Sequence, residues 1–348
     1  MRKAVAILAV LAAIAIYVGA PRAQMSWDGV HSVAIGPDGA LYFLYGPDIE
    51  RRINKRVENI NSDQGVSAEM SRIRVAPDGT IFANDLRGGR VLRISGGQAE
   101  TILTKGDPRI SPDPFISGRF QPDGLAIDSA GNIFIGDIGN GWLLQYDNSG
   151  QVKRLAGVDP VYEGAGEGAR ITQESKGLFD GPALQAKLRN PSYLAVGPDG
   201  SIFIAEGTDG LIRQYKQGNL TTIAGGLKPD GTREVGFRDG PGTSALLGWQ
   251  LTGLAADKEG NLFVMDNQNH CVRQLSWDAA SGMYYVYTLA GSPKNPGTNK
   301  DGNGFNADFA SYLDLVVDSK KTLYLANSSD YNIRTVSWMG EVRTINVR

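Results

Sequence analysis

The sequence predicts an all-β fold, a six-bladed β-propeller made of four-stranded antiparallel blades. Short apolar runs alternate with turn sequences such as Pro-Asp-Gly along most of the chain. One pattern of glycine, aliphatic and aromatic positions recurs six times. The chain also has 45 glycines among 348 residues, which is roughly 13% against about 7% in average usage. This composition suits a protein with many tight turns.

The clearest copy of the repeat occupies residues 193–225. It contains four short apolar runs, Leu194–Val196, Ile202–Ala205, Leu211–Tyr215 and Leu220–Ala224. Pro-Asp-Gly, Gly-Thr-Asp-Gly and Gln-Gly-Asn separate these runs, and such residues favour turns because they supply a preset or a positive φ. The pattern predicts an up-and-down antiparallel meander. A sheet this small is only marginally stable alone, so it needs neighbours that cover its faces.

The six copies share one register, which starts at the turn residue before the second strand: Gly39, Gly79, Gly131, Gly200, Gly260 and Lys321. An aromatic residue follows three positions later in every copy: Tyr42, Phe82, Phe134, Phe203, Phe263 and Tyr324. Thirteen positions after the turn residue stand Arg52, Leu92, Leu144, Arg213, Arg273 and Arg334. The first copy is the weakest, because its third and fourth strands must come from the charged stretch Ile49–Ile60. A closed ring of six such blades buries both faces of each sheet.

The N-terminus predicts export. Arg2 and Lys3 precede an unbroken apolar run, Ala4–Ala20, and Ala23 is a suitable last residue before cleavage. We therefore expect residues 1–23 to be a signal peptide and residues 24–348 to be a single propeller domain, located in the periplasm, outside the cell or at the cell surface. An uncleaved anchor helix is the alternative, and it is the one contact with a membrane that the sequence suggests.

Charge and cysteine content narrow the classes of partner. The formal net charge is −2, and loss of Arg2, Lys3 and Arg22 with the signal peptide changes it to −2 − 3 = −5. A negatively charged chain is not expected to bind nucleic acid. Cys271 is the single cysteine, so no intrachain disulfide can form. We expect a monomer.

Several segments resemble the NHL repeat, among them GLAIDSAGNIFIGD, GLAADKEGNLFVMDNQNHCVRQL and FDGPALQAKLRNPSYLAV. The connecting segments carry a second signature, Asp-Gly with Ala six residues after the Asp: Asp180-Gly181…Ala186, Asp239-Gly240…Ala245 and Asp301-Gly302…Ala307. This signature is similar to the loops of bacterial secreted NHL propellers. The resemblance covers roughly residues 30 to 347 and implies the six-bladed fold. It does not imply one function, because propellers serve both as enzymes and as binding modules.

Insertions indicate a binding face. The spacing between repeats varies almost entirely between the fourth strand of one unit and the first strand of the next, in Ser111–Arg119, Val158–Asn190, Gly226–Gln250 and Ser292–Tyr312. Insertions at one connection map to one face of a repeat array, and that face often binds a partner. The candidate ligand-binding residues are Trp142, Trp249, Phe305, Tyr312, Tyr331 and Arg74. The aromatic side chains could instead hold the long loops in place.

A polar column ends the second strands: Tyr45, Asp85, Asp137, Glu206, Asp266 and Asn327. Asp137, Glu206, Asp266 and Asn327 are candidate ligands for a cation such as Ca²⁺ in the central channel, since hard cations take oxygen ligands. The alternative is that each carboxylate caps backbone N–H groups of its own loop. We expect this local capping for at least three of the four acids in the column, Asp85, Asp137, Glu206 and Asp266. The expected exception is Glu206, because its longer side chain can extend past the turn.

Arg74 and the two histidines do not follow the repeat pattern of charged and apolar positions. Arg74 occupies a position that is small or apolar in every other repeat. It either reaches the channel and pairs with a carboxylate, because a buried charge needs a partner, or fills a gap left by the short first blade. His31 and His270 are the only histidines, which argues against a zinc enzyme, and the resemblance implies that His270 belongs to a turn.

The function that these patterns favour is binding or scaffolding, with a protein, a peptide or a glycan held on the loop-rich face. The alternative is a hydrolase or lyase similar to gluconolactonases or strictosidine synthases, which use a divalent cation held by Glu, Asn and Asp in the channel. Beyond the shared fold no motif of those enzymes is present, and no catalytic residue is assigned. The sequence therefore favours a protein that is not an enzyme.

Overall fold

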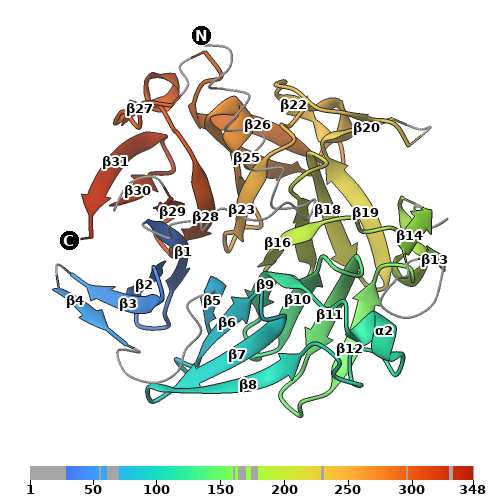
Figure 1. Ribbon diagram of the computed structural model, residues 1–348. Coiled ribbons are helices and arrows are strands. Elements are labelled where there is room, and N and C mark those ends of the chain that lie inside the picture. Colours follow the sequence, from blue (N-terminus) through green and yellow to red (C-terminus); the bar gives the residue numbers. More distant parts are fainter. Residues whose placement is uncertain are drawn as a thin grey trace, which may run out of the picture.

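The computed structural model describes residues 29–54, 56–60, 70–159, 161–163, 170–173, 179–228, 231–294, 297–328 and 332–347. These residues form six antiparallel sheets of four or five strands, arranged as blades around a central axis (Figure 1). The predicted six-bladed propeller is confirmed. Among the described helices none has the length and hydrophobicity of a membrane span.

Each blade is a meander of consecutive strands. Blades 1 to 3 have four strands each: β1 (Val30–Ile35), β2 (Leu41–Tyr45), β3 (Asp48–Ile53), β4 (Arg56–Asn59); β5 (Met70–Val75), β6 (Ile81–Asp85), β7 (Arg90–Ser95), β8 (Gln98–Thr104); β9 (Pro122–Ile127), β10 (Ile133–Asp137), β11 (Trp142–Tyr146), β12 (Val152–Ala156). Blades 4 to 6 have the corresponding strands β16 (Pro191–Val196), β17 (Ile202–Glu206), β18 (Leu211–Lys216), β19 (Asn219–Ala224); β23 (Leu251–Ala256), β24 (Leu262–Asp266), β25 (Cys271–Asp278), β26 (Met283–Gly291); β28 (Tyr312–Val317), β29 (Leu323–Asn327), β30 (Asn332–Val336), β31 (Glu341–Asn346).

The insertions add short elements. A fifth strand pairs with the fourth strand of blades 4, 5 and 6, and a 3₁₀ turn follows it each time: β15 (Gly181–Pro182) with η2 (Ala183–Gln185), β22 (Gly240–Pro241) with η3 (Gly242–Ser244), and β27 (Gly302–Asn303) with η5 (Gly304–Asn306). Two hairpins, a short α-helix and a further 3₁₀ turn complete the described elements: β13 (Val161–Glu163) with β14 (Arg170–Gln173), β20 (Gly226–Leu227) with β21 (Arg233–Glu234), α2 (Pro114–Ser117) and η4 (Asn267–Asn269).

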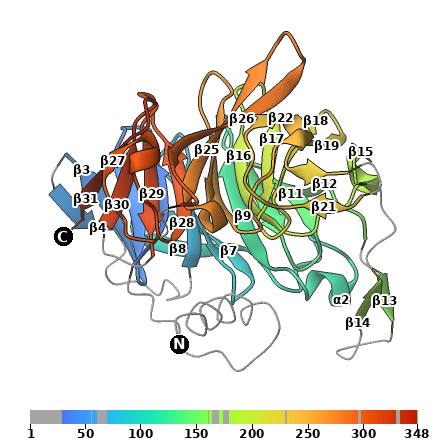
Figure 2. The ribbon, with the colours of Figure 1, turned by 90° about the horizontal axis from the view of Figure 1, so that it is seen from above.

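The alternation of strand direction defines two faces. The connections between blades and the loops from second to third strands share one face, here called the loop-rich face. The turns from first to second and from third to fourth strands share the other, here called the hairpin face. In the side view of Figure 2, α2 and the β13–β14 hairpin lie towards the lower edge.

The repeated turn glycine has a conformational cause. Gly39, Gly79, Gly131, Gly200 and Gly260 have φ between 75° and 87°, a region that side chains other than glycine rarely adopt. Lys321 takes their place in blade 6 and adopts the same conformation, with a φ of 62°. The weak first repeat contains a comparable turn residue, because Asn54 between β3 and β4 has a φ of 56°.

Every innermost strand contains a β-bulge near its start, on the side of the loop-rich face. The pairing with the second strand skips one residue in each blade: His31, Ser71, Asp123, Ser192, Gly253 and Leu313. A bulge changes the direction of the neighbouring side chains. The sequence pattern did not reveal these six bulges, although they bring polar groups to the axis.

The hydrophobic core lies between the blades. Each of six apolar clusters joins two neighbouring blades, as expected when every sheet buries both faces. Between blades 6 and 1, Val33 and Phe43 pack with Ala326 and Ile333. No described strand of blade 6 joins the sheet of blade 1, so side-chain contacts close the ring among the described residues.

Candidate functional site

Four acids end the second strands of blades 2 to 5, and all four side chains are buried: Asp85, Asp137, Glu206 and Asp266. Asp137 illustrates their bonding. Its carboxylate accepts hydrogen bonds from Gln121 N (2.9 Å), Gly139 N (3.0 Å) and Asn140 Nδ2 (2.7 Å). Burial raises the pKa of Asp137, and these hydrogen bonds oppose the rise. The carboxylate thus ties the incoming connection of its blade to the β10–β11 loop.

Glu206 bonds to groups beyond its own loop. It accepts hydrogen bonds from Arg189 N (2.6 Å) and from Arg213 Nη1 (2.7 Å). The carboxylate of Asp85 accepts bonds from Gly88 N (2.7 Å) and Arg90 Nε (2.8 Å). Asp85, Asp137 and Asp266 each accept a bond from a backbone N–H of their own loop, from Gly88, Gly139 and Asn269. The bonds to Glu206 come instead from the incoming connection and from β18, so the prediction of three locally bonded acids with Glu206 as the exception is confirmed.

Asp266 belongs to a clamp that the Asp-Gly signature completes. Arg273 has a fully buried side chain, and its Nη1 lies 3.1 Å from Asp266 Oδ2. Its Nη2 donates to Asp239 Oδ1 (2.6 Å). Thr288 donates to the same carboxylate through its N (3.0 Å) and Oγ1 (3.0 Å). The clamp fixes the fifth strand to blade 5.

The same clamp recurs in two other blades. Its members are Asp180, Arg213 and Thr222 in blade 4, and Asp301, Arg334 and Thr344 in blade 6. A buried arginine needs such partners because an unpaired buried charge is costly. The Asp-Gly signature therefore has a structural role in all three blades.

Arg74 meets the carboxylate that its position suggested. Its Nη1 and Nη2 donate to Asp314 Oδ2 (2.8 Å) and Oδ1 (3.1 Å). Its Nη1 also donates to Val33 O (3.2 Å), which belongs to blade 1. Ser32 Oγ donates to Asp314 Oδ2 at 2.6 Å. The ion pair therefore joins the innermost strands β28, β1 and β5.

A second arginine extends this axial network. Arg72 Nη2 lies 3.3 Å from Asp123 Oδ1, and its Nη1 lies 3.4 Å from Asp314 Oδ1. Its guanidinium stacks 4.2 Å above the ring of Tyr193. Burial alone would raise the pKa of Asp314, but Arg74 and Arg72 outweigh burial and hold it below its usual value. Two arginines and two aspartates thus neutralise one another near the axis.

Arg72, Asp123, Tyr193 and Asp314 were not among the residues predicted from the sequence to form a site. Arg72, Tyr193 and Asp314 share the third position of their innermost strands, where the other blades have Ser32, Gly124 and Gly253. This column mixes large polar residues with small ones, and that irregularity was the available signal.

The aromatic candidates lie in different environments. Trp142 is buried, and its Nε1 donates to Val158 O (3.1 Å). Tyr312 is buried, and its hydroxyl donates to Asn299 Oδ1 (2.7 Å). These two side chains hold loops in place, which is the alternative that the sequence left open.

Two other aromatic candidates are exposed or partly exposed, unlike Trp142 and Tyr312. Phe305 is 61% exposed, and it lies beside the β30–β31 turn because Gly304 N donates to Gly340 O. Trp249 is partly exposed at the loop-rich face, and its N donates to Gln268 Oε1 (2.7 Å). Tyr331 lies outside the described residues.

The candidate metal ligands each have partners within the protein. Asn327, the fourth of them, donates through Nδ2 to Asn332 Oδ1 (3.0 Å). In the part of the chain that the structure describes, no three His, Cys, Asp or Glu side chains gather in a metal-binding arrangement.

His270 and Cys271 occupy structural positions. His270 closes η4 with a φ of 51°, and its Nδ1 lies 3.0 Å from Phe309 O. The thiol of Cys271 is buried, and burial raises its pKa well above the usual value. A thiol in this state is a poor nucleophile.

An exposed apolar surface that the sequence analysis did not single out surrounds η4. Val235 and Phe237 are 41% and 40% exposed, and with Trp249 they form what we call the η4 patch. Gly236, between the first two, donates through its N to Leu247 O (3.0 Å). Its carbonyl accepts a bond from Asn269 Nδ2 (2.8 Å). The backbone of the patch is thus held against the loop-rich face.

No protein-family model matches the chain. Among curated proteins it is similar to teneurin-4 of Mus musculus, with 23% identity over 285 residues, and of Homo sapiens, with 24% identity over 280 residues. Each alignment covers 77% of this chain and 10% of teneurin-4. The chain therefore spans about a tenth of the length of these relatives.

The fold is similar to that of several solved structures. An auxiliary nutrient binding protein from Bacteroides ovatus has a TM-score of 0.61 and 14% identity, over 92% of this chain and 70% of that one. A protein of unknown function from Bacteroides thetaiotaomicron has a TM-score of 0.60 and 16% identity, over 92% and 70%. Virginiamycin B lyase from Staphylococcus aureus has a TM-score of 0.53 and 10% identity, over 93% and 86%. At these identities the likeness shows the fold alone.

Proposed function

We propose that this protein is an exported binding or scaffolding propeller of the NHL type that holds a protein, peptide or glycan on its loop-rich face. The observation that carries the proposal is the η4 patch. Its apolar side chains are exposed while the backbone that bears them is held by hydrogen bonds to Leu247 and Asn269. A surface that is ordered before binding loses little conformational entropy when a partner docks.

The chemistry of the patch suits a partner with an apolar or ring-shaped surface. Phe237 packs with one face against the Arg273 guanidinium, 5.0 Å from its ring centroid, and 40% of the residue remains exposed. Close by, Arg233 forms an ion pair with Asp209 of the β17–β18 loop. Aromatic anchors beside charged groups are typical of binding hot spots.

Export is part of the proposal. It rests on residues 1–23, which lie outside the described residues and have the charge and hydropathy pattern of a signal peptide. Fractionation of cells, with N-terminal sequencing of the exported protein, tests it. A protein found only in the cytoplasm would contradict this part.

The fold does not decide between a binding protein and an enzyme, since its structural neighbours include both a binding protein and a lyase. The site favours binding. The acids that the enzyme alternative would use as cation ligands already accept hydrogen bonds from backbone and side-chain donors within the protein. The binding proposal needs no rearrangement of these groups.

The test compares two faces of the same molecule. The purified protein is screened against peptide and oligosaccharide arrays, and the affinity of the best ligand is then measured by calorimetry. The double variant Val235→Ser/Phe237→Ser should weaken binding about tenfold or more, as expected for hot-spot residues. Trp338→Ser is the matched control, because Trp338 is 64% exposed in the β30–β31 turn on the hairpin face. Equal affinity for the double variant and the wild type, or an equal loss in the control, would contradict the proposal.

A further inference from the structure

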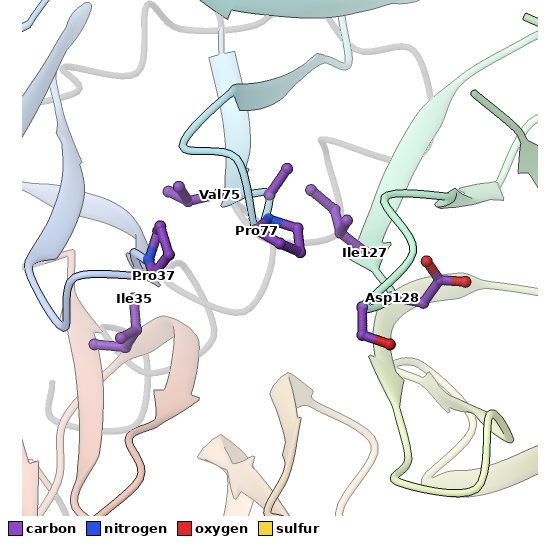
Figure 3. A pocket seen from close by; sticks show the side chains of 8 residues that line it. Ile35, Pro37, Val75, Pro77, Ile127 and Asp128 are labelled. Carbon is purple, nitrogen blue, oxygen red and sulfur yellow. The ribbon is translucent and has the colours of Figure 1, made fainter. Parts of the chain in front are cut away.

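The hairpin face, opposite the proposed binding surface, contains a pocket of about 330 Å³ at the mouth of the central channel (Figure 3). Its walls come from blades 1, 2 and 3. Ile35, Val75 and Ile127 end the innermost strands β1, β5 and β9, and Pro37 and Pro77 belong to the turns that follow. Three equivalent aliphatic side chains and two prolines give the pocket an apolar lining.

The pocket is confined to one half of the ring for a physical reason. In the other half, neighbouring turns contact one another. Pro198 lies against Gly260, and Lys321 Nζ lies 3.3 Å from Glu259 Oε2. Gly197 precedes Pro198 in blade 4 just as Gly36 precedes Pro37 in blade 1, so the contacts between turns, and not the size of this residue, distinguish the two halves.

The axial network limits the depth of the pocket. Arg74 precedes the pocket residue Val75, and its Nη1 donates to Ile73 O (2.7 Å) and Val33 O (3.2 Å). Those carbonyls belong to residues two positions before Val75 and Ile35, and so lie deeper in the channel as seen from the hairpin face. Because Asp314 neutralises this guanidinium, a ligand in the pocket meets no unpaired cation at the inner end.

The rim of the pocket is acidic. Asp128 lines the pocket, and Asp38 and Asp78 directly follow the lining prolines Pro37 and Pro77. The three turns, GPDGA, APDGT and DSAGN, contain no Lys or Arg. Arg51 neutralises Asp38. Asp78 is exposed, and the hydrogen bond from Thr80 N lowers its pKa, so it is ionised at neutral pH. Asp128 accepts bonds from Ala130 N (2.9 Å) and Asn132 N (2.8 Å).

An apolar pocket beside carboxylates has one complementary ligand chemistry. The aliphatic lining favours a hydrocarbon body, because burial of apolar surface is favourable. The rim favours a positive charge and disfavours a negative one. We propose that this pocket binds a small hydrophobic cation, an organic ammonium with an aliphatic or aromatic body.

Three probes of matched size and shape test the proposal: hexylammonium, hexan-1-ol and hexanoate, titrated into the full-length purified protein and followed by methyl NMR of isoleucine. Ile35 and Ile127 should report saturable binding. The affinity should decrease from hexylammonium to hexan-1-ol to hexanoate, with about a tenfold difference between the two ions at low salt that shrinks as salt is added. Hexan-1-ol binding as tightly as hexylammonium would overturn the charge argument, and no saturable shift for any probe would overturn the site.

Two variants locate the binding. Asp78→Asn should weaken hexylammonium at least threefold and leave hexan-1-ol unchanged. Asp199→Asn is its matched control, because Asp199 has the same turn position in blade 4, and no residue of blade 4 lines the pocket. Val75→Phe, which fills the pocket, should abolish the binding of all probes. An unchanged hexylammonium affinity in Asp78→Asn, or binding that persists in Val75→Phe, would contradict the assignment. Val235→Ser/Phe237→Ser should leave all three affinities unchanged, so this test is independent of the proposed function.

Discussion

Arg74 and Asp314 are 240 positions apart in the sequence, yet they form a buried ion pair through two hydrogen bonds of 2.8 and 3.1 Å. Arg74 comes from blade 2 and Asp314 from blade 6, and Ser32 of blade 1, which lies between them, donates to the same carboxylate. Because no described strand is shared between blades 6 and 1, this pair is one of the contacts that close the ring.

Asp314→Asn should therefore destabilise the protein strongly. The substitution leaves Arg72 and Arg74 near the axis without their buried carboxylate, and removing one partner of a buried ion pair costs about 3–5 kcal/mol. Urea unfolding measures the loss. Asp199→Asn is the control, because Asp199 pairs with Lys216 at the surface, where an ion pair contributes about 0–1 kcal/mol. A similar small effect for both variants would show that the axial pair does not hold the ring closed.

The clamp arginines should contribute to stability, whereas the equivalent residue of blade 1 should not. Arg273→Met leaves the buried carboxylate of Asp266 without its arginine and removes the bond from Arg273 to Asp239. The free energy of unfolding should therefore fall by about 3–5 kcal/mol. Arg52 has the same register position but is only partly buried, and its Nε donates to Asn54 O (3.2 Å). Arg52→Met should cost less than about 1 kcal/mol. Equal losses in the two variants would contradict the clamp.

The stability should fall in acid because of Asp314. Its folded-state pKa is lowered, so its contribution is present above the unfolded value of about 3.9 and is lost as the pH falls through the folded value. The pKa of Asp137 is raised in the folded protein, so protonation of Asp137 at low pH favours the folded state and opposes the effect of Asp314. The difference in unfolding free energy between wild type and Asp314→Asn should therefore shrink below about pH 4, as measured by urea titrations across the acid range. A difference that does not change with pH would contradict this prediction.

Calcium should not stabilise the protein, because the candidate ligands Asp137, Glu206 and Asp266 are already bonded to protein donors. A cation that binds only the folded state raises the free energy of unfolding by about 2.7 kcal/mol at a hundredfold excess over Kd. Thermal melting in calcium and in chelator measures this. A calcium-dependent rise in Tm that disappears in Glu206→Gln would support the enzyme alternative.

The thiol of Cys271 provides a reporter of global unfolding. Because this side chain is buried and its pKa is raised, it should react with a thiol reagent only when the protein opens. The labelling rate should therefore rise in Asp314→Asn in proportion to the loss of stability, when opening is fast relative to labelling. Rapid labelling of the native wild-type protein would contradict the described burial.

Local sequence determined the blades. The turn glycines, the aromatic column and the alternating apolar runs depend on interactions between residues close in the chain, so the number of blades and the turn positions follow from the sequence. The same holds for the acids at the ends of the second strands, which bond groups in adjacent loops. Gly39 and Lys321 show how strongly the turn is specified, because both adopt a positive φ.

Tertiary structure alone decided which residues meet at the axis and on the two faces. Arg72 and Arg74 of β5, Asp123 of β9 and Asp314 of β28 come from three distant segments, and no local pattern relates these segments. The six bulges likewise appear only when second strands pair with first strands. The η4 patch and the pocket on the hairpin face depend on loops packing against neighbouring blades. Such contacts arise from ring closure, which brings distant residues together through packing rather than through spacing in the chain.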